Sequence, residues 1–281
     1  MAWTDMTALT GLVAWYKPET LAATYANGDP IDTWADSSGN GYDLTGTTTT
    51  RPLALASAIN GYMAADFDGT DDKLWSGSFT ATQEPHHFYI VTEVDTLKNW
   101  NELLCIDDDP SSPLWSSAYF HLFAYSDGAV ACNVNSSNFA RTEDTIAGNA
   151  GLAATTPAII SASGWLYDEA SSTCVSGINI NGGRAGQGSG TLAASGTAYI
   201  GMGVIGVTTA LDGKVVEAII TKGQGRGVDT PWIEGYLADK YAITLADGHL
   251  FKNAAPENAP TTYNATGGAT LASDARIERL K

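Results

Sequence analysis

Residues 211–220 read Leu-Asp-Gly-Lys-Val-Val-Glu-Ala-Ile-Ile, an Asp-Gly turn signal followed by an apolar run that contains one acid. Asp-Gly is favoured in hairpin turns and β-branched residues are favoured in strands, so Lys214–Thr221 is predicted to be a buried strand. Alternation predicts one face with Val216, Ala218 and Ile220, and another with Val215, Glu217 and Ile219. Because a buried carboxylate needs hydrogen-bond donors, we expect loop amides to bind Glu217 and its role to be bracing the fold.

Short apolar or alternating runs of this kind recur along the chain, separated by turn signals such as Asn181-Gly182-Gly183. The predicted strands are Leu12–Tyr16, Tyr62–Phe67, His87–Asp95, Glu102–Asp107, Ala118–Tyr125, Ala129–Asn135, Ala158–Leu166, Val175–Ile180, Ala198–Val204 and Lys214–Thr221. Residues 136–157 and 182–197 are polar and small, and we expect loops there. About ten strands with little helix predict an all-β protein, an antiparallel two-sheet jelly-roll sandwich.

One short helix is predicted near the end of this pattern. Asp229 or Thr230 can cap it, and Pro231 suits its first position. Its apolar face is predicted to hold Trp232, Ile233, Tyr236, Leu237 and Tyr241, and its other face Glu234, Asp239 and Lys240. Such an amphipathic helix would lie on the sandwich. We therefore expect a sandwich domain over residues 1–252 and a C-terminal extension, a candidate docking segment, over residues 253–281.

Composition and charge narrow the classes of function. The chain has 281 residues, and its net charge is 14 − 31 = −17. An acidic protein repels phosphate backbones, so we expect no nucleic-acid partner. Residues 213–281 hold eight bases and eight acids, so residues 1–212 carry the whole excess. That asymmetry predicts an acidic body with a docked neutral end; the alternative is a chance distribution.

No stretch of the sequence approaches 18 apolar residues, so we expect no membrane span. Met1–Gly11 has neither the basic nor the apolar segment of a secretory signal, which predicts a protein made in a cytoplasm.

Five motifs occur in an order and spacing that resembles laminin-G-like domains of the concanavalin A-like lectin/glucanase superfamily. They are Leu12-Val13-Ala14-Trp15-Tyr16, Thr33-Trp34-Ala35-Asp36-Ser37-Ser38-Gly39-Asn40-Gly41, Asp66-Phe67-Asp68-Gly69-Thr70-Asp71-Asp72-Lys73-Leu74, the stretch 211–220 and Glu234-Gly235-Tyr236-Leu237-Ala238-Asp239-Lys240-Tyr241. The variant most similar to this chain is common in bacteriophage virion proteins and bacterial surface proteins. The resemblance spans roughly residues 10–250. It departs at Ala242, where the family often has a Gly that suits a left-handed helix cap.

The acids in these motifs make sense as structural groups. Asp36 and the serines beside it can bond nearby N–H groups, and Asp68, Asp71 and Asp72 can tie the turn after a buried strand. With Glu217, the structural carboxylates predicted are Asp36, Asp68 and Asp71.

Glycoside hydrolysis is the enzymatic option that the resemblance implies. It needs two carboxylates across the scissile bond, and the laminarinase-type pattern is Glu-x-Asp-x-Glu, or the same with one extra residue, on one strand. Glu93-Val94-Asp95 supplies the first two acids, but Leu97 or Lys98 stands where the last Glu belongs. We therefore predict a protein that is not an enzyme.

Metal binding has an oxygen-rich candidate. Asp107, Asp108 and Asp109 suit Ca²⁺, as does the Asp68/Asp71/Asp72 group, but Asp107–Asp109 precede Pro110-Ser111-Ser112-Pro113, an ordinary exposed turn. No other cofactor is expected. The four histidines are predicted not to form a transition-metal site, and the three cysteines, Cys105, Cys132 and Cys174, are predicted to be buried free thiols.

Sugar binding would use aromatic faces near polar groups. The candidates are Trp100, Trp115, Tyr119 and Tyr125 in the middle of the chain. Together these patterns predict a non-enzymatic bacteriophage virion protein, a head-decoration, fibre or tail-associated component that displays a lectin-like domain. Its expected partners are other virion proteins or sister subunits, contacted through 253–281, and a host-surface glycan. The alternatives are a carbohydrate-binding adhesion module and, after it, a glycoside hydrolase.

Overall fold

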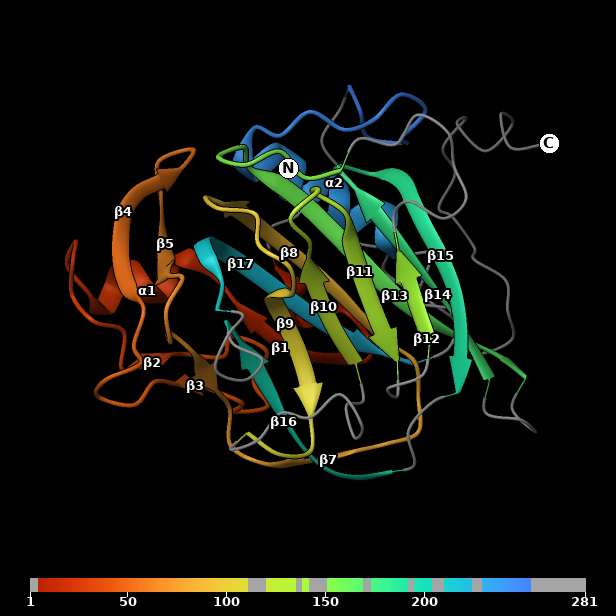
Figure 1. The fold of residues 1–281 in the computed structure, drawn as a ribbon, viewed down its shortest axis with the longest axis horizontal. Coiled ribbons are helices and arrows are strands. Elements are labelled where there is room, and N and C mark those ends of the chain that lie inside the picture. The colour runs from red at the N-terminus through yellow and green to blue at the C-terminus, as the bar shows by residue number, and fades with distance from the viewer. Residues whose placement is uncertain are drawn as a thin grey trace.

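The structure is a computed structural model that describes residues 5–110, 120–134, 138–141, 151–168, 173–191, 195–203, 210–223 and 229–253. Its strands form two antiparallel sheets, which confirms the predicted all-β sandwich (Figure 1). The eight-stranded sheet has the order β15 (Gly183–Thr191), β14 (Thr173–Ile180), β13 (Ala158–Asp168), β8 (His86–Val94), β17 (Asp212–Lys222), β5 (Tyr62–Asp68) and β4 (Leu53–Ile59), with β1 (Leu12–Tyr16) also paired to β17.

The nine-stranded sheet carries the middle of the chain. Its order is β12 (Asn138–Arg141), β11 (Val130–Val134), β10 (Phe120–Ala124), β9 (Asn101–Asp107), β16 (Gly196–Met202), β6 (Leu74–Trp75), β3 (Leu44–Thr45) and β2 (Thr33–Trp34), with β7 (Phe79–Ala81) paired to β16. The main core lies between the sheets, where Phe88 and Ile90 of β8 belong to one apolar cluster with Ile106 of β9 and Phe120 of β10. The rings of Phe88 and Phe120 meet edge to face, with centroids 4.4 Å apart.

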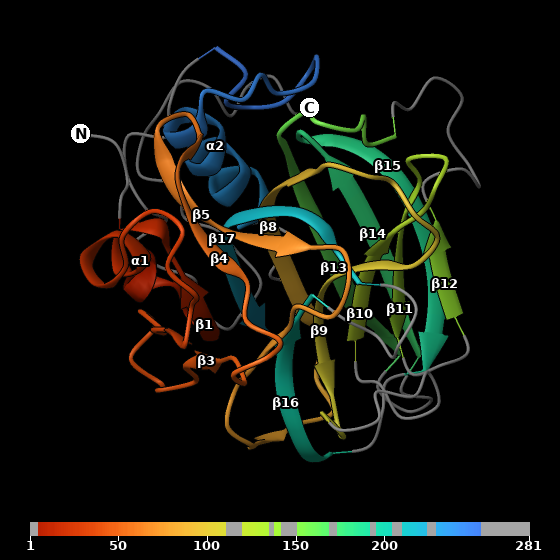
Figure 2. The ribbon, with the colours of Figure 1, turned by 60° about the vertical axis from the view of Figure 1, so that its left-hand side comes forward.

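Helix α2 (Thr230–Tyr241) covers the outer face of the eight-stranded sheet (Figure 2). Its Ile233 and Leu237 pack with Trp15, Val216 and Ile219 in a second apolar cluster. Glu234, expected on the polar face of the helix, is instead buried and accepts a hydrogen bond from Asn179 Nδ2 at 2.9 Å. The helix therefore buries more of its circumference than an amphipathic pattern suggests.

The two faces predicted for β17 are corrected by a bulge. The pairing with β8 shifts between Val215 and Glu217, so Val216 is an extra residue. Val215 faces the main core together with Ala218, and Val216 packs under α2. The extra residue interrupts the alternation of side chains, which a sequence pattern alone does not reveal.

The ends of α2 differ from the expected caps. Asp229 occupies the N-cap position, but its side chain makes no capping bond, and the Thr230 hydroxyl instead lies 2.9 Å from the hydroxyl of Tyr89. At the other end Ala242 adopts the left-handed conformation, with φ 53° and ψ 36°. Alanine therefore fills the position that Gly would suit best.

Several elements were missed by the sequence pattern. Segments 136–157 and 182–197 were expected to be loops, yet they contain β12 and β15. Helix α1 (Pro18–Thr24) follows β1 directly, starts at a proline and buries Leu21 in the main core. A second short helical turn, η1, spans Met6–Ala8. Neither described α-helix has the length and apolar character needed to cross a membrane.

Candidate functional site

The Glu217 carboxylate is buried beneath α2 and binds four donors. Its Oε1 accepts from Trp15 Nε1 at 2.7 Å and from the Tyr236 hydroxyl at 2.9 Å. Its Oε2 accepts from Lys240 Nζ at 2.8 Å and from the Tyr241 hydroxyl at 2.5 Å. The donors are therefore side chains of β1 and α2, not the loop amides that we expected.

Asp36 connects the turn after β2 to β1. One of its carboxylate oxygens accepts from the backbone N–H of Trp15 at 2.9 Å and of Ser38 at 2.8 Å. The other accepts from the Ser38 hydroxyl at 2.7 Å and the Tyr42 N–H at 3.1 Å. Both oxygens are therefore engaged inside the protein, and the turn they hold carries Tyr42 to the pocket described below.

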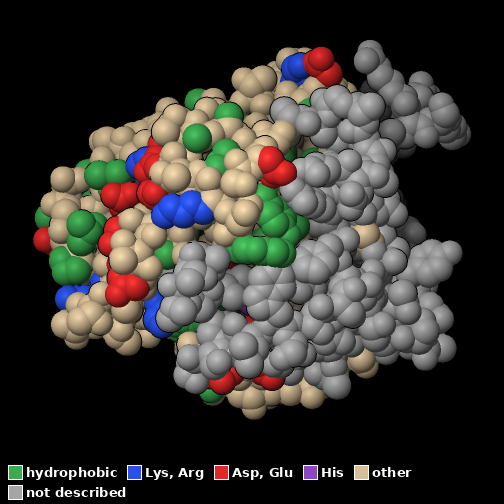
Figure 3. All heavy atoms as spheres, viewed as in Figure 1, with side chains coloured by type: hydrophobic (Ala, Val, Ile, Leu, Met, Phe, Trp, Pro, Cys, Tyr) green, Lys and Arg blue, Asp and Glu red, His purple; other side chains and the backbone are tan. Residues whose placement is uncertain are grey.

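Glu93 and Asp95, the acids of the partial glycosidase pattern, share one ammonium group. Lys214 Nζ lies 2.8 Å from Glu93 Oε1 and 2.6 Å from Asp95 Oδ1. Asp66 stands opposite Lys214 on β5, and burial, partly offset by the Lys214 charge, raises its pKa. A glycosidase acid must have a proton to donate, whereas the bonded oxygens of Glu93 and Asp95 accept hydrogen bonds from Lys214. Figure 3 likewise shows basic side chains beside acidic ones on the described part of one face.

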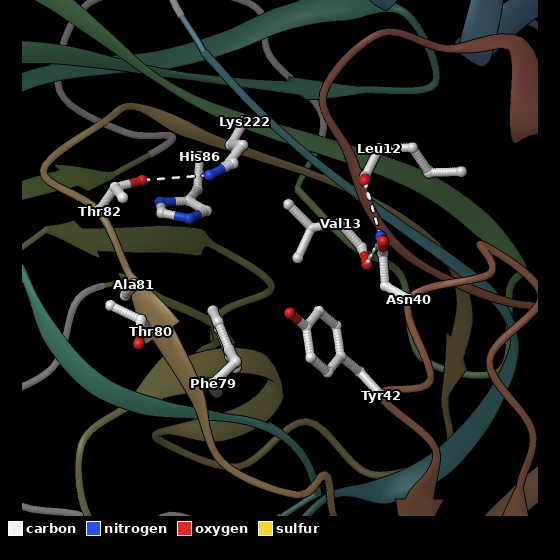
Figure 4. A pocket seen from close by; sticks show the side chains of 10 residues that line it. All are labelled: Leu12, Val13, Asn40, Tyr42, Phe79, Thr80, Ala81, Thr82, His86 and Lys222. Atoms are coloured by element: carbon white, nitrogen blue, oxygen red, sulfur yellow. Dashed lines mark hydrogen bonds between the residues drawn. The ribbon is translucent and has the colours of Figure 1, made fainter.

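A pocket that no sequence pattern indicated lies where strands β1, β7, β8 and β17 approach the 40–42 turn (Figure 4). Its volume is about 210 Å³. The rings of Tyr42 and Phe79 form an aromatic pair with centroids 5.0 Å apart. Figure 4 shows these two rings toward one end of the pocket, and His86 and Lys222 toward the other. The pocket thus combines apolar faces with hydrogen-bonding groups.

The polar end of this pocket is formed by Thr82, His86 and Lys222. Lys222 Nζ lies 3.2 Å from the Thr82 hydroxyl and 3.8 Å from Glu84. His86 is 4% exposed, and burial, helped by the neighbouring His87 and Lys222, lowers its pKa to about 3. It is therefore neutral near pH 7. Its Nε2 is buried and has no hydrogen-bond partner among the described residues.

Of the four aromatic residues predicted to bind sugar, the structure describes Trp100 and Tyr125. The centroid of the Trp100 ring lies 4.6 Å from the ring centroid of Tyr125 and 5.1 Å from that of Phe123. The three rings lie on the outer face of the nine-stranded sheet. Trp100 is half-buried, whereas Tyr125 and Phe123 are buried. Trp115 and Tyr119 lie outside the described residues. The described part of this group is thus an aromatic cluster with one partly exposed ring.

The acids considered for Ca²⁺ separate into two arrangements. Asp107 is fully buried, with Oδ1 bound by the N–H of Asp109 at 3.0 Å, and Asp108 is exposed, so the three carboxylates do not converge. Asp68, Asp71 and Asp72 do gather, with one oxygen of each within 4.8 Å of the others.

The acidic group after β5 also ties its own turn. Asp72 Oδ2 accepts the Asp68 N–H at 2.9 Å, and Asp68 Oδ1 accepts the Thr70 N–H at 2.7 Å. Asp71 is exposed. Binding of Ca²⁺ here stays a prediction, and a calcium titration followed by melting temperature tests it.

No protein-family model and no curated protein matches this sequence. Among solved structures, the chain is similar to a GH54 α-L-arabinofuranosidase soaked with a cyclic sulfate inhibitor, with TM-score 0.56 and 11% identity over 85% of this chain and 61% of that chain. It is also similar to domain 4 of AbnA, a GH43 extracellular arabinanase from Geobacillus stearothermophilus, in complex with arabinotriose (TM-score 0.50, 15% identity, 75% of this chain and 92% of that chain).

A third similar structure is the Trypanosoma rangeli sialidase in complex with the inhibitor DANA, with TM-score 0.52 and 10% identity over 83% of this chain. The chain spans only 33% of that sialidase's length. At these identities the likeness shows the fold alone: this β-sandwich is shared with parts of carbohydrate-active proteins.

Sequence reasoning also missed a buried polar cluster formed by Glu102, Cys105, Asp107 and His121 on the nine-stranded sheet. His121 Nε2 lies 2.9 Å from Asp107 Oδ2, and His121 Nδ1 lies 2.8 Å from Glu102 Oε1. Alternation along β9 puts Cys105 and Asp107 on one face, and a register shift opposite Leu122 and Phe123 brings Glu102 to the same face. The alternation was readable in the sequence; the shift was not.

Proposed function

We propose that the chain is a carbohydrate-binding β-sandwich without hydrolytic activity, and that it holds a sugar in the pocket between Tyr42, Phe79 and His86. The observation that carries this proposal is the combination of an aromatic pair with a buried, neutral histidine whose Nε2 has no partner among the described residues. Aromatic faces pack on the apolar C–H faces of sugars, while convergent polar groups bind sugar hydroxyls.

The size of the pocket suits a small ligand. Its 210 Å³ is below the range of about 300–1,000 Å³ typical of pockets for drug-sized molecules, so a single sugar residue at a chain end is the expected occupant. The neutral His86 ring can exchange a hydrogen bond with a sugar hydroxyl, and the Thr82 hydroxyl and Lys222 ammonium lie beside it. The domain of AbnA with a similar fold was crystallised with arabinotriose, which supports the sugar class.

The absence of hydrolysis in this proposal rests on Lys214. A retaining or inverting glycosidase needs one carboxyl group that gives a proton and another that attacks or activates water. Here one ammonium group bonds both Glu93 and Asp95 and occupies the space between them. The third acid of the pattern is missing as well, because Leu97 and Lys98 stand in its place.

Within the same proposal the sandwich is the displayed part of a bacteriophage virion protein. Support comes from the resemblance of residues 10–250 and from the acidic charge of residues 1–212. Assembly in a host cytoplasm, and attachment through 253–281 to other virion proteins or sister subunits, stay predictions from sequence.

A glycan array read in parallel with a reducing-sugar assay tests the proposed function. We expect the protein to bind a defined set of glycans and to release no reducing sugar from any of them. Sugar release by the wild type that disappears in Glu93→Gln would establish a hydrolase instead. A protein that binds no glycan on the array would remove the carbohydrate proposal.

A further inference from the structure

The buried cluster on the outer face of the nine-stranded sheet contains lone-pair donors that face one another. Glu102 and Asp107 are fully buried, and Cys105 and His121 are at most 3% exposed. One ligand atom from each of Glu102, Cys105 and His121 lies within 4.8 Å of the others. A carboxylate oxygen, a thiol sulfur and an imidazole nitrogen therefore converge where water is excluded.

The contact between His121 and Glu102 is close but poorly formed as a hydrogen bond. His121 Nδ1 lies 2.8 Å from Glu102 Oε1, yet neither that nitrogen nor either Glu102 oxygen has a hydrogen bond of acceptable geometry within the described chain. Buried carboxylates normally bind donors, because an unsatisfied one costs several kcal/mol. A bound group that contacts both His121 Nδ1 and the Glu102 carboxylate would give each of them a partner.

The other nitrogen of His121 is held as metal-binding histidines usually are. Nε2 lies 2.9 Å from Asp107 Oδ2, and Asp107 is itself fixed by the Asp109 N–H. A carboxylate on the far ring nitrogen sets the tautomer, leaves the near nitrogen with its lone pair, and increases its basicity toward a metal.

We infer that Glu102, Cys105 and His121 bind a divalent transition-metal ion, with Zn²⁺ the expected metal, and that Asp107 orients the histidine. Zinc takes sulfur, nitrogen and oxygen ligands at about 2.0–2.3 Å, so tetrahedral ligand atoms lie roughly 3.3–3.8 Å apart. The three ligand atoms lie within 4.8 Å of one another. Side-chain shifts of about 1 Å would bring them to the tetrahedral spacing. The thiolate ligand disfavours Ca²⁺ and Mg²⁺, which prefer oxygen.

The test is metal content and cobalt spectroscopy on the full chain. After refolding with Zn²⁺ and dialysis, mass spectrometry should find about one zinc per wild-type chain, and far less in Cys105→Ala and His121→Gln. Cys132→Ala is the matched control, because Cys132 is also a buried cysteine but faces the main core; it should keep its zinc.

Cobalt adds a spectroscopic readout that the wild type alone can pass or fail. Wild-type protein loaded with Co²⁺ should show a thiolate-to-cobalt charge-transfer band, present in Cys132→Ala and lost in Cys105→Ala. A wild type that retains no zinc, or whose cobalt spectrum lacks the thiolate band, would overturn the inference. Neither readout involves sugar, so failure here is distinct from failure of the proposed function.

Discussion

Trp15 donates its indole N–H to Glu217 over 2.7 Å, a bond between residues 202 positions apart in the chain. Trp15 lies on β1 and Glu217 on β17, and these strands pair directly. The same carboxylate binds Tyr236 and Tyr241 of α2. The buried Glu217 carboxylate therefore links β1 and α2 to β17, in the middle of the eight-stranded sheet.

Removing this carboxylate should be costly. Glu217→Ala leaves an indole N–H, two phenol hydroxyls and the Lys240 ammonium without their shared acceptor, so we expect the free energy of unfolding to fall by about 3–5 kcal/mol. Glu19→Ala is the control, because Glu19 pairs with the same lysine but is half exposed; its effect should stay below about 1 kcal/mol. Urea denaturation measures both, and equal effects would show that Glu217 does not fasten α2.

The left-handed residue after α2 offers a stabilising change. Ala242→Gly removes the clash of a Cβ at φ 53° and should raise the free energy of unfolding by roughly 1 kcal/mol. Asp239→Gly, one turn earlier on the exposed side of the helix, should lower it by about 0.5–1 kcal/mol. Thermal unfolding distinguishes them; destabilisation by both would mean that Ala242 is not left-handed in solution.

Ionisation of Asp72 should lower the free energy of unfolding as pH rises from about 4 to 6. Burial raises the pKa of Asp72 to about 6 from the ordinary 3.8. The folded protein therefore holds this proton to a higher pH than the unfolded chain does, and ionisation between the two pKa values favours unfolding. Asp72→Asn still has an oxygen to accept the Asp68 N–H. The melting temperature of wild type minus that of the variant should fall between pH 4 and 6, and a constant difference would contradict the prediction.

The C-terminal extension, residues 253–281, is predicted to attach the sandwich domain to a virion. Deletion of residues 253–281 should abolish association with virions while leaving the melting temperature of the sandwich nearly unchanged. Co-sedimentation with purified particles, with the full chain as control, measures this. Normal incorporation of the truncated chain would refute the role of the tail.

The sequence predicted the fold well where strands carry apolar side chains. All ten predicted strands correspond to observed ones, with ends that differ by a few residues, because burial between two sheets demands apolar runs. Strand β15, Gly183–Thr191, has hardly any apolar residues, so its sequence predicts a loop. It pairs with β14 along its length, so backbone hydrogen bonds, not side-chain pattern, define it.

The candidate sites were less accessible to sequence reasoning. The pocket joins Tyr42, Phe79 and Lys222, which the chain brings together only through long-range strand pairing. The Glu102, Cys105 and His121 cluster depends on an irregular register between β9 and β10 that turns Glu102 to the face of His121. Residue types at such sites are visible in the sequence, but their convergence is a property of sheet order and bulges.

The most direct measurement of the central claim is the affinity for a glycan identified on the array, by titration calorimetry, for wild type, Phe79→Leu and Trp100→Leu. Each change removes an aromatic face but keeps apolar bulk. The pocket account predicts that Phe79→Leu weakens binding at least tenfold, about 1.4 kcal/mol, and that Trp100→Leu binds as the wild type does. Unchanged affinity in Phe79→Leu, with loss of binding in Trp100→Leu, would contradict it and move the sugar to the outer face of the nine-stranded sheet.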